Sequence, residues 1–489
     1  MTPRRRYLLA AVSAMTLLTA CGSATSTTAG QSADPTFVSI AGDGTETGTE
    51  TGADATSSTG DGTGTDTSGI DESGIDRHDS AGDLEWDAAE EQQIDLSSGS
   101  VTIENPGTYR LTGTLADGQV TVASDGEGKV RLILDNASIT NSTGPAIFVE
   151  AADEVVIVLA DGTTNSVSDG SGYSLADGGE AAIASFADLT ITGWGALTVT
   201  GNTNDGINTK DGLVFGGGTV QVTAVDDGIR GKDYVVVDGS AVTVDAAGDG
   251  VKSDNDEDEG RGQVAVVSGS LTISAGDDGV KGETSVTVSG GTVLVTRAYE
   301  GLEAATVTID GGTVGVTTSD DGLNGSALVI TGGDITVDAL GDGIDINGSI
   351  TMTGGTVTVV GPTENMNGPI DYDGTFDISG GTIVATGSAG MAMAPSQSSS
   401  QGSLLATFAT QAAGSVVEVR AADGTVVLTV TPSRQFASIA LSTPALQDGV
   451  TYEIVVNGTV VASTTTADAV SQSGPGGGQG GPGGNRPQP

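Results

Sequence analysis

The sequence predicts an all-β protein that consists mainly of a right-handed parallel β-helix of about 22 residues per coil, followed by a small antiparallel β module. The first observation behind this prediction is an Asp-Gly step, followed by an aliphatic residue, that returns after 21 or 22 residues in five of six intervals. The sixth interval is 29 residues long, because an acidic insert at 254–260 interrupts the repeat. The acidic residues of the successive copies are Asp205, Asp227, Asp249, Asp278, Glu300, Asp321 and Asp342.

A second phrase, Gly-Gly-Thr-Val-x-Val, keeps the same period and begins at Gly217, Gly290, Gly311 and Gly354. Self-similarity at a fixed period of about 20 to 50 residues is typical of stacked supersecondary units. Within one period, runs rich in Val and Ile that are separated by turn residues predict strands at 220–224, 228–230 and 234–237. Three strands and three corners make one coil of a parallel β-helix.

The repeat also predicts rows of side chains along the long axis, because stacked coils lie about 4.8 Å apart. Alternation along 228–230 buries Ile229 and points Arg230 outward. We therefore expect two adjacent external rows, of which the first contains the seven acidic residues given above. The second row lies three residues later and consists of Arg230, Lys252, Lys281, Glu303, Asn324 and Asp345.

Such a row of acids needs compensation. Two carboxylates about 4.8 Å apart repel by roughly 1 kcal/mol in water and by roughly 3 to 4 kcal/mol at an effective dielectric constant near 20. Residues 202–260 contain thirteen acids and four bases, so ion pairs within this segment cannot neutralise it. Bound cations are the plausible remedy, and a set of carboxylate and carbonyl oxygens suits Ca²⁺.

The predicted calcium ligands are taken from the acidic row, from three doubled acids and from the insert. For a single Asp the alternative is turn chemistry, in which Asp accepts from nearby amides and Gly takes a positive φ. The doubled acids favour metal, because a turn does not require the second carboxylate. The insert fits three EF-hand ligand positions but has Glu259 where Gly is needed, so a solvated acidic loop stays open. The candidates are Asp205, Asp226, Asp227, Asp249, Asp254, Asp256, Asp258, Asp277, Asp278, Asp320, Asp321 and Asp342.

Residues 1–20 predict a secretory signal peptide, with three arginines, a short Leu- and Ala-rich run and then small residues. The apolar run is too short to span a membrane. The segment 18–21 (LTAC) resembles a bacterial lipobox, which implies that Cys21 is acylated; the alternative is an ordinary signal peptide that ends near a cysteine. We expect export by the Sec or the twin-arginine route and a lipid anchor on the outer side of the cell membrane, at the cell surface.

Residues 21–84 are rich in Thr, Ser, Gly, Asp and Ala and predict a disordered linker. It contains His78, the single histidine, which we expect to be solvated, and this argues against metal or acid–base chemistry that depends on histidine. The net charge is −47, or −50 after removal of 1–20, which argues against nucleic acid as a partner. We expect contact with the membrane only through the lipid on Cys21.

The predicted β-helix domain is 85–395, and residues 86–93 are expected to form a short helix over its open end. After a break in the repeat near Met391, alternating strands predict a capping module at 396–466 with antiparallel pairing. Residues 467–489 are a Gly- and Pro-rich tail that we expect to be disordered. The four strands predicted for the capping module are 415–419, 426–430, 438–441 and 451–456.

Six segments of the chain have a wording that belongs together: 130–136, 144–147, 159–165, 189–193, 226–232 and 248–253. Together they resemble one family, the secreted bacterial carbohydrate-binding β-helix proteins of plant-cell-wall-degrading organisms, whose fold is similar to that of pectate lyases. The resemblance covers roughly 86–452, and its most specific mark is the acidic insert. It implies calcium bound along the β-helix and affinity for acidic plant polysaccharide such as polygalacturonate. Glu300 departs from the pattern, which has Asp there.

A calcium-lined face can hold uronate carboxylates by ion bridging, with Arg230, Lys252 and Lys281 as charged donors. Trp194 and Tyr299 are candidates for stacking on sugar rings, and the alternative for each is ordinary packing. Aromatic residues make up 3% of the chain, which argues against a broad platform for crystalline cellulose.

Two other functions stay open beside a non-catalytic, monomeric binding protein. A calcium-dependent polysaccharide lyase acting on uronates needs a base beside the ion, and Lys252 or Lys281 would supply it. We prefer the alternative that these lysines neutralise neighbouring aspartates. A structural adhesin or surface stalk would need only the anchor and the linker.

Overall fold

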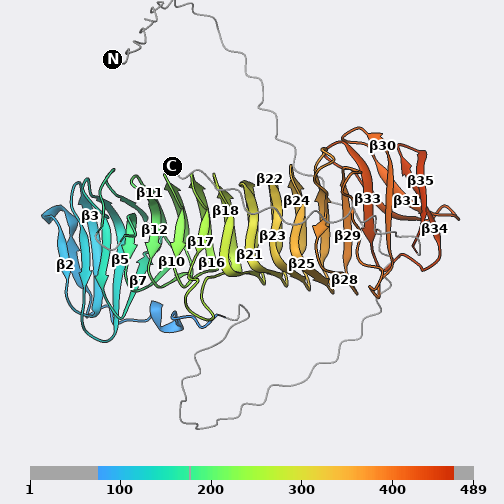
Figure 1. Cartoon of the computed structure of the whole chain (residues 1–489). Helices are drawn as coiled ribbons and strands as arrows, with labels where there is room; N and C mark the ends of the chain where they lie inside the picture. Colours follow the sequence, from blue (N-terminus) through green and yellow to red (C-terminus); the bar gives the residue numbers. More distant parts are fainter. Residues whose placement is uncertain (1–74, 176–177, 467–489) are drawn as a thin grey trace, which may run out of the picture. The chain divides into compact units, whose positions relative to one another are not determined.

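The computed structural model describes residues 75–175 and 178–466 of the 489-residue chain. The strands wind into a parallel β-solenoid of about 12 turns with about 23 residues per turn (Figure 1). Each strand pairs with the equivalent strand one turn later, as Ile229 does with Val251 and Val251 with Val280. The predicted parallel β-helix is confirmed, including the turn that carries the 29-residue interval.

The solenoid has three faces, each a column of parallel strands. The first face contains β1 (Gln92–Asp95), β3 (Gly107–Leu115), β5 (Lys129–Thr140), β7 (Glu154–Leu159), β10 (Asp188–Gly193), β13 (Gly212–Phe215), β16 (Tyr234–Ala246), β18 (Gln263–Ser274) and β28 (Phe376–Ile378). The second face contains β2 (Val101–Ile103), β4 (Val120–Ala123), β6 (Ile147–Ala151), β9 (Ala181–Ser185), β12 (Asp205–Thr209), β15 (Ile229–Gly231), β17 (Val251–Ser253) and β27 (Asp371–Tyr372).

The third face follows the first across a corner. It contains β8 (Thr164–Ser168), β11 (Ala196–Gly201), β14 (Thr219–Ala224), β20 (Thr292–Arg297), β22 (Thr313–Ser319), β24 (Asp334–Ala339), β26 (Thr356–Val360) and β29 (Thr382–Gly387). Several strands turn a corner and serve two faces. Those that start on the second face and end on the first are β19 (Val280–Val288), β21 (Glu300–Ile309), β23 (Asp321–Ile330) and β25 (Ile344–Met352).

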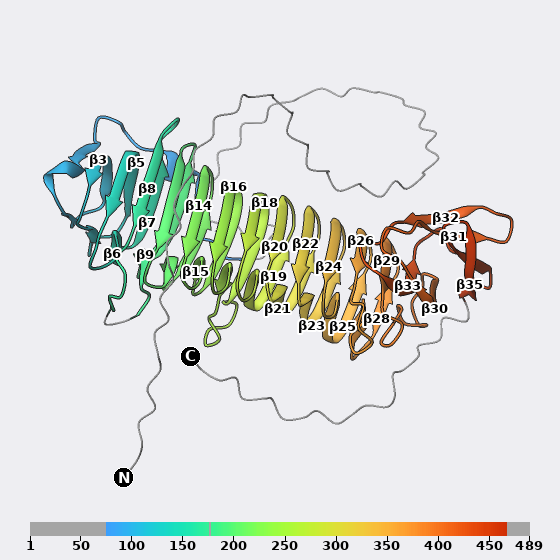
Figure 2. The same cartoon turned by 90° about the horizontal axis from the view of Figure 1, so that it is seen from above.

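The chain after the solenoid forms the predicted antiparallel module, which Figure 2 shows at the end of the stack. Strand β33 (Phe436–Ser442) pairs antiparallel with both β29 and β30 (Ser403–Gln411), so the module continues the third face. A separate four-stranded sheet contains β32 (Val426–Val430), β31 (Val417–Ala421), β34 (Thr451–Val456) and β35 (Thr459–Thr465).

The interior of the solenoid is a continuous column of aliphatic side chains. In one turn Val222, Ile229 and Val235 come from the three faces, and each is at most 1% exposed. Burying each such side chain contributes roughly 1.5 to 3 kcal/mol, and the contribution repeats from turn to turn. This repetition is what holds together a chain without a disulfide framework.

The glycine of each Asp-Gly step is required by space and not by a positive φ. A Cβ atom on Gly228 would lie 2.2 Å from Cγ1 of Val244 and 2.7 Å from the carbonyl oxygen of Gly250. None of the seven equivalent glycines is among the described residues with positive φ, whereas the second glycine of the other phrase is, with φ 68° at Gly291 and 72° at Gly312. The alternative to metal binding is that the Asp-Gly step is an ordinary turn in which Gly takes a positive φ. The positive φ that this alternative requires is not present, so that part of it is wrong.

The expectation of a short helix near the N-terminal end of the solenoid is also wrong. Residues 86–93 do not form a helix: β1 begins at Gln92 and pairs in parallel with β3, because the edge of β3 offers unpaired backbone groups to the preceding segment. The described helices are two 3₁₀ turns, η1 (Ala81–Leu84) and η2 (Leu96–Ser98). Within η2, Leu96 is 0% exposed and closes the core.

Residues 75–91, which we call the strap, lie against the outer side of the first face. Ile75 packs on Val214, Tyr234 and Val236, and Arg77 forms an ion pair of 3.0 Å with Asp238. The expectation that His78 is solvated is wrong, because its side chain is 9% exposed and its Nδ1 lies 2.6 Å from the Tyr234 hydroxyl. Part of the polar segment predicted as linker thus packs on the solenoid.

Candidate functional site

The structure brings the seven acidic residues of the Asp-Gly steps into one row, at the start of the second face. Glu300, for example, is in register with Asp321 one turn later. The expectation that the row is external is wrong for Asp205, Asp227, Asp249 and Asp278, which are at most 7% exposed, whereas Glu300, Asp321 and Asp342 are half-buried. We call these residues the acidic row.

One oxygen of these carboxylates joins successive turns. Oδ1 of Asp227 accepts a hydrogen bond of 2.8 Å from the backbone N–H of Asp249, and Oδ1 of Asp249 accepts one of 3.0 Å from Asp278. Oδ1 of Asp321 likewise accepts from the N–H of Asp342 at 2.6 Å. Because an ionised acceptor makes a strong hydrogen bond, this contact supplements strand pairing and gives the aspartate a structural role.

We call Arg230, Lys252 and Lys281 the basic row. The second carboxylate oxygen of Asp249 and of Asp278 contacts a lysine of this row. The Nζ atom of Lys252 lies 2.6 Å from Oδ2 of Asp249 and 3.5 Å from Oδ2 of Asp227. The Nζ atom of Lys281 lies 2.7 Å from Oδ2 of Asp278 and also contacts Glu303. The lysines therefore neutralise their neighbours, which is the arrangement we preferred from the sequence.

These ion pairs bear on the lyase alternative. Burial alone would lower the pKa of Lys252, but Asp249 and Asp227 outweigh it and raise that pKa above the ordinary value. The pKa of Lys281 is also raised, since Asp278 and Glu303 outweigh burial. Both side chains stay protonated at neutral pH, whereas a general base must be free of its proton.

In the turns after Lys281, the positions in register with the basic row contain no base. They are occupied by Glu303, Asn324 and Asp345. Burial, together with neighbouring carboxylates, raises the pKa of Glu300 and of Asp342 to about 7. In these turns the acidic row lacks the compensation that lysine supplies in the earlier ones.

Two groups of three carboxylates in the described residues gather ligand oxygens within 4.8 Å of one another. The first is Asp249, Asp277 and Asp278, and the second is Asp278, Glu300 and Glu303. Each group includes carboxylates that already contact a lysine, which are Asp249 and Asp278 in the first group and Asp278 and Glu303 in the second. We take the first group as the candidate for a divalent cation, because it contains both acids of a doubled pair, Asp277 and Asp278.

The first acid of each doubled pair, Asp226, Asp277 or Asp320, lies in an outer row that runs beside the acidic row. Backbone hydrogen bonds link Asp226, Gly248, Asp277, Tyr299 and Asp320 in successive turns, at N to O distances of 2.7 to 3.1 Å. The doubled acids therefore alternate with other residues and lie about 10 Å apart along the axis. Tyr299, 47% exposed, lies between Asp277 and Asp320.

The acidic insert does not gather its predicted ligands. Asp254 contacts Arg230, and Asp258 accepts a hydrogen bond of 3.0 Å from the Asn255 amide, while Asp256 is exposed. Asn255, 1% exposed, accepts from two backbone N–H groups and organises the loop. The loop between β17 and β18 projects from the stack in Figure 2.

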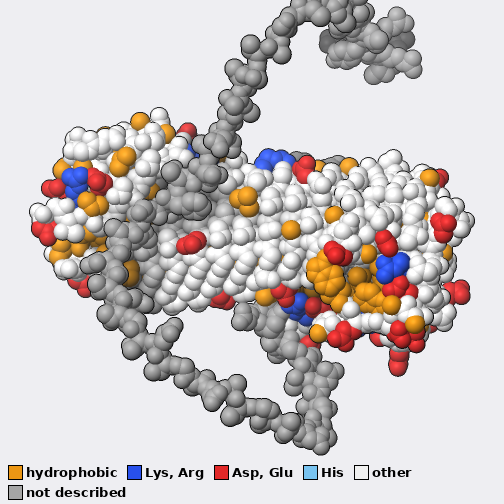
Figure 3. All heavy atoms as spheres, turned by 180° about the vertical axis from the view of Figure 1, so that it is seen from behind, with side chains coloured by type: hydrophobic (Ala, Val, Ile, Leu, Met, Phe, Trp, Pro, Cys, Tyr) orange, Lys and Arg blue, Asp and Glu red, His pale blue; other side chains and the backbone are white. Residues whose placement is uncertain are grey.

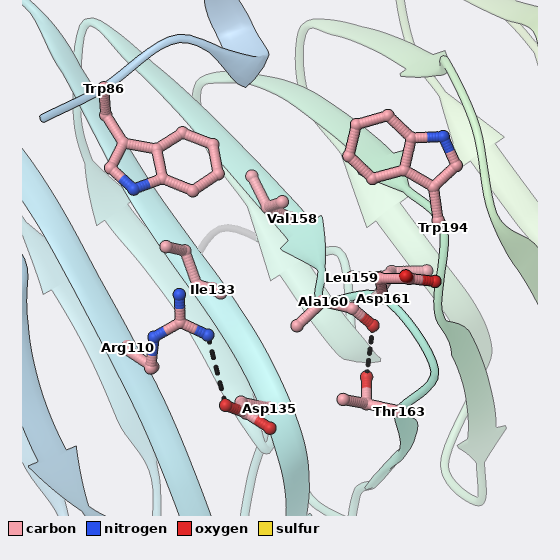
Figure 4. A pocket seen from close by; sticks show the side chains of 10 residues that line it. All are labelled: Trp86, Arg110, Ile133, Asp135, Val158, Leu159, Ala160, Asp161, Thr163 and Trp194. Atoms are coloured by element: carbon pink, nitrogen blue, oxygen red, sulfur yellow. Dashed lines mark hydrogen bonds and ion pairs between the residues drawn. The ribbon is translucent and has the colours of Figure 1, made fainter. Parts of the chain in front are cut away.

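Trp194 lies at a different corner, in the turn between β10 and β11, and is 69% exposed. It lines an open cavity of about 290 Å³ together with Trp86 of the strap (Figure 4). Sequence reasoning missed Trp86 as a site residue, because the predicted helix at 86–93 assigned it to the open end of the coil. The signal that was available is that the chain has only two tryptophans.

Cys21 and the predicted signal peptide lie outside the described residues. Within the described part of the chain, no helix has the length and apolar character needed to cross a membrane.

Residues 97–327, which run from η2 into β23, match the model of a family described as carbohydrate-binding domain-containing protein. This part of the chain is thus similar to carbohydrate-binding domains.

A protein with the same description from Acetivibrio thermocellus is 39% identical over 72 residues, which are 15% of this chain and 25% of that protein. The chain therefore spans a quarter of the length of this curated relative. The solved structure of the polysaccharide lyase-like protein from C. thermocellum, a gadolinium derivative, is 31% identical and aligns with 46% of this chain and 93% of its own, with a TM-score of 0.40.

Proposed function

We propose that this protein binds polysaccharide through its β-solenoid, and that calcium held by Asp249, Asp277 and Asp278 bridges the protein to the carboxylates of an acidic plant polysaccharide such as polygalacturonate. The observation that carries the proposal is the meeting of three carboxylates within 4.8 Å. They lie beside the exposed ring of Tyr299, in a segment similar to carbohydrate-binding domains.

The chemistry of this group suits Ca²⁺, which takes about six to eight oxygen ligands. Three carboxylates leave coordination positions for water and for the carboxylate of a uronate. Tyr299 follows Asp277 in the outer row and offers an aromatic face to a neighbouring sugar ring. The basic row is 24% to 32% exposed, so its ammonium and guanidinium groups remain within reach of a bound anion.

The proposal is binding without cleavage. The two lysines that would act as the base of a lyase are engaged with carboxylates, and the raised pKa of each favours the charged form. A charged ammonium supplies a hydrogen-bond donor for a carboxylate or hydroxyl oxygen, which is what retention of a polymer requires.

We further propose that the binding domain is held at the cell surface by a lipid on Cys21, since the segment 18–21 resembles a lipobox. Most of the linker then lies between the anchor and the strap. Metabolic labelling with a palmitate analogue tests this: the wild-type chain should be labelled and Cys21→Ser should not.

Calorimetry of calcium binding tests the site itself. After EDTA treatment and dialysis, the protein should take up calcium, and Asp277→Asn should weaken the association at least about tenfold because one anionic ligand is lost. Asp245→Asn removes an exposed carboxylate from β16 and should bind as the wild type does.

A pull-down with polygalacturonate, with and without EDTA, completes the test. Retention that requires calcium and falls in Asp277→Asn supports the proposal. Absence of calcium uptake, or retention that is indifferent to EDTA, contradicts the calcium bridge. Absence of retention under every condition contradicts polygalacturonate as the ligand.

A further inference from the structure

The cavity that contains both tryptophans is built as a cleft on the outer side of the first face. Trp86 and Trp194 stand on either side of it, and Figure 4 shows Val158 between them. Its floor contains Ile133 and Val158, which are 1% and 2% exposed, and Ala160 packs beside them. Figure 3 shows this surface as an apolar patch bordered by acidic and basic side chains, toward the end of the solenoid where β3 to β7 lie.

The backbone of Trp194 is held in place although the side chain is exposed. Its backbone N–H donates a hydrogen bond of 3.0 Å to the carbonyl of Leu159, and the N–H of Gly195 donates one of 3.1 Å to the same oxygen. A Cβ atom on Gly193 would lie 2.3 Å from that oxygen, and one on Gly195 would lie 2.4 Å from the carbonyl of Ala160. The two glycines let this turn pack closely against the preceding one, which fixes the backbone from which the indole projects.

Trp86 is fixed by a chain of polar contacts. Its Nε1–H donates a hydrogen bond of 2.8 Å to Glu91, and Arg110 donates two bonds of 2.8 and 3.0 Å to the same carboxylate. Arg110 holds the pKa of Glu91 down, to about 2, against the effect of burial, so the anchor stays ionised in mild acid. The cleft is therefore held by the indole contacts of Trp86 at one end and by the backbone of Trp194 at the other, which lowers the entropy cost of binding.

The charges in the cleft disfavour an anion. Arg110 is the one base among the lining residues, and it is already paired with Glu91 and with Asp135 at 3.1 Å. Asp161 adds another carboxylate, which is exposed. Carboxylates outnumber the guanidinium, and they can accept hydrogen bonds from hydroxyl groups.

We propose that the cleft between Trp86 and Trp194 is a second binding site, for the uncharged pyranose rings of a neutral polysaccharide. A pyranose ring presents C–H groups on its faces and hydroxyl groups around its edge. The faces match indole rings and an aliphatic floor, and the edge matches Asp135 and Asp161. Arg110, Ile133 and Val158 occupy equivalent positions in successive turns, so the floor extends about 10 Å along the axis, the length of a short oligosaccharide.

This inference rests on the proposed function only in taking a polysaccharide as the ligand. The cleft shares no residue with the three-carboxylate group or with Tyr299, and its ligand needs no calcium. A chain with both sites would hold an acidic and a neutral polymer through different faces of the same solenoid.

Tryptophan fluorescence tests the inference directly, because the only two tryptophans of the chain line this cleft. The full chain in EDTA is titrated with cellohexaose, mannohexaose and hexagalacturonate. We expect a saturable change in emission with at least one of the two uncharged oligosaccharides and none with hexagalacturonate.

Calorimetry with the same uncharged oligosaccharide then measures variants. Trp194→Ala should lower the affinity about tenfold or more, and Trp194→Phe, which keeps an aromatic face, should recover part of the loss. Leu340→Ala, which truncates a 58% exposed side chain outside the cleft, should bind as the wild type does. Because the Trp194 side chain is largely exposed, its removal should leave the melting temperature unchanged.

The inference is overturned if neither uncharged oligosaccharide gives saturation, if Trp194→Ala binds with wild-type affinity, or if hexagalacturonate binds equally well in EDTA. Calcium-dependent retention on polygalacturonate distinguishes the two proposals. If that retention persists while the fluorescence does not titrate, the neutral-sugar site alone is refuted; if the fluorescence titrates while retention fails, the calcium bridge alone is refuted.

Discussion

The two residues of the Asp-Gly step have different roles, one in charge and hydrogen bonding and one in packing. The sequence pattern alone does not distinguish these roles. Asp249, for example, accepts an N–H from the next turn with one carboxylate oxygen and contacts Lys252 with the other. The glycine leaves room for a core Val or Ile side chain and for a backbone carbonyl group of the following turn. The order of the two residues thus encodes stacking as well as charge.

Replacing Gly228 by Ala tests the packing role. The added Cβ would lie 2.2 Å from Val244 Cγ1, so we expect a loss of about 1 to 3 kcal/mol in the free energy of unfolding, measured by urea denaturation. Gly82→Ala is the control, because its Cβ would meet only the Ser80 hydroxyl at 3.5 Å. Equal stability of the two variants would contradict the steric explanation.

Replacing Lys252 by Met tests the charge role. Asp249 would be left 3% exposed without its ammonium partner. We expect a loss of about 2 to 3 kcal/mol, less than a fully buried pair would lose because Lys252 is 24% exposed. Adding Asp249→Asn should recover part of it, since an amide oxygen can still accept from the N–H of Asp278. A single variant as stable as the wild type would show that the pair is not stabilising.

At the scale of the element, sequence reasoning succeeds where the repeat is regular and fails where it stops. The interior strands and the registers of the acidic and basic rows follow from the period, because each turn must match the next. The position of the strap could not be predicted, because the strap contains no repeat. Its residues Ile75, His78 and Trp86 pack on strands that lie much later in the chain. The burial of the first four residues of the acidic row could not be predicted either, because the spacing of residues in a sequence does not show how deep a side chain at a corner lies.

The uncompensated turns of the acidic row predict an unusual dependence on pH. Burial raises the folded-state pKa of Glu300 from 4.5 to about 7 and that of Asp342 from 3.8 to about 7. The folded chain then holds protons that the unfolded chain releases, so stability should fall as pH rises from about 4 to about 7 and level off above. Melting temperatures in EDTA between pH 5 and 8 measure this decline.

Asp342→Asn isolates the effect. The amide oxygen can still accept from the N–H of Gly368, which the carboxylate does at 2.6 Å, but no proton is taken up. The variant should show a smaller decline than the wild type. A melting temperature that rises from pH 5 to pH 7 in both proteins would contradict the role assigned to buried carboxylates.

At the scale of the whole molecule, a net charge of −47 opposes the approach of any anionic polymer. Calcium at a local site gives attraction only at short range, so the long-range repulsion should limit the rate of encounter. The two proposed ligands therefore differ in kinetics, because a neutral chain does not experience this field.

Surface plasmon resonance at fixed free calcium tests the effect of charge. The association rate constant for polygalacturonate should increase several-fold as NaCl is raised from about 0.01 M to about 0.15 M, because the Debye length falls from about 30 Å to about 8 Å. The association rate constant for an uncharged oligosaccharide should stay constant. An association rate for polygalacturonate that decreases with salt would mean that a positive surface steers it.

The turn of 29 residues shows how much the solenoid tolerates at one corner. Val251 and Val280 pair in register although the acidic loop separates them, and Asn255 closes the base of that loop on its own backbone. Chain length between β17 and β18 is thus independent of the ladder on either side. Evolution, or a protein engineer, can lengthen or exchange this loop to graft a new recognition segment onto the scaffold without changing any strand.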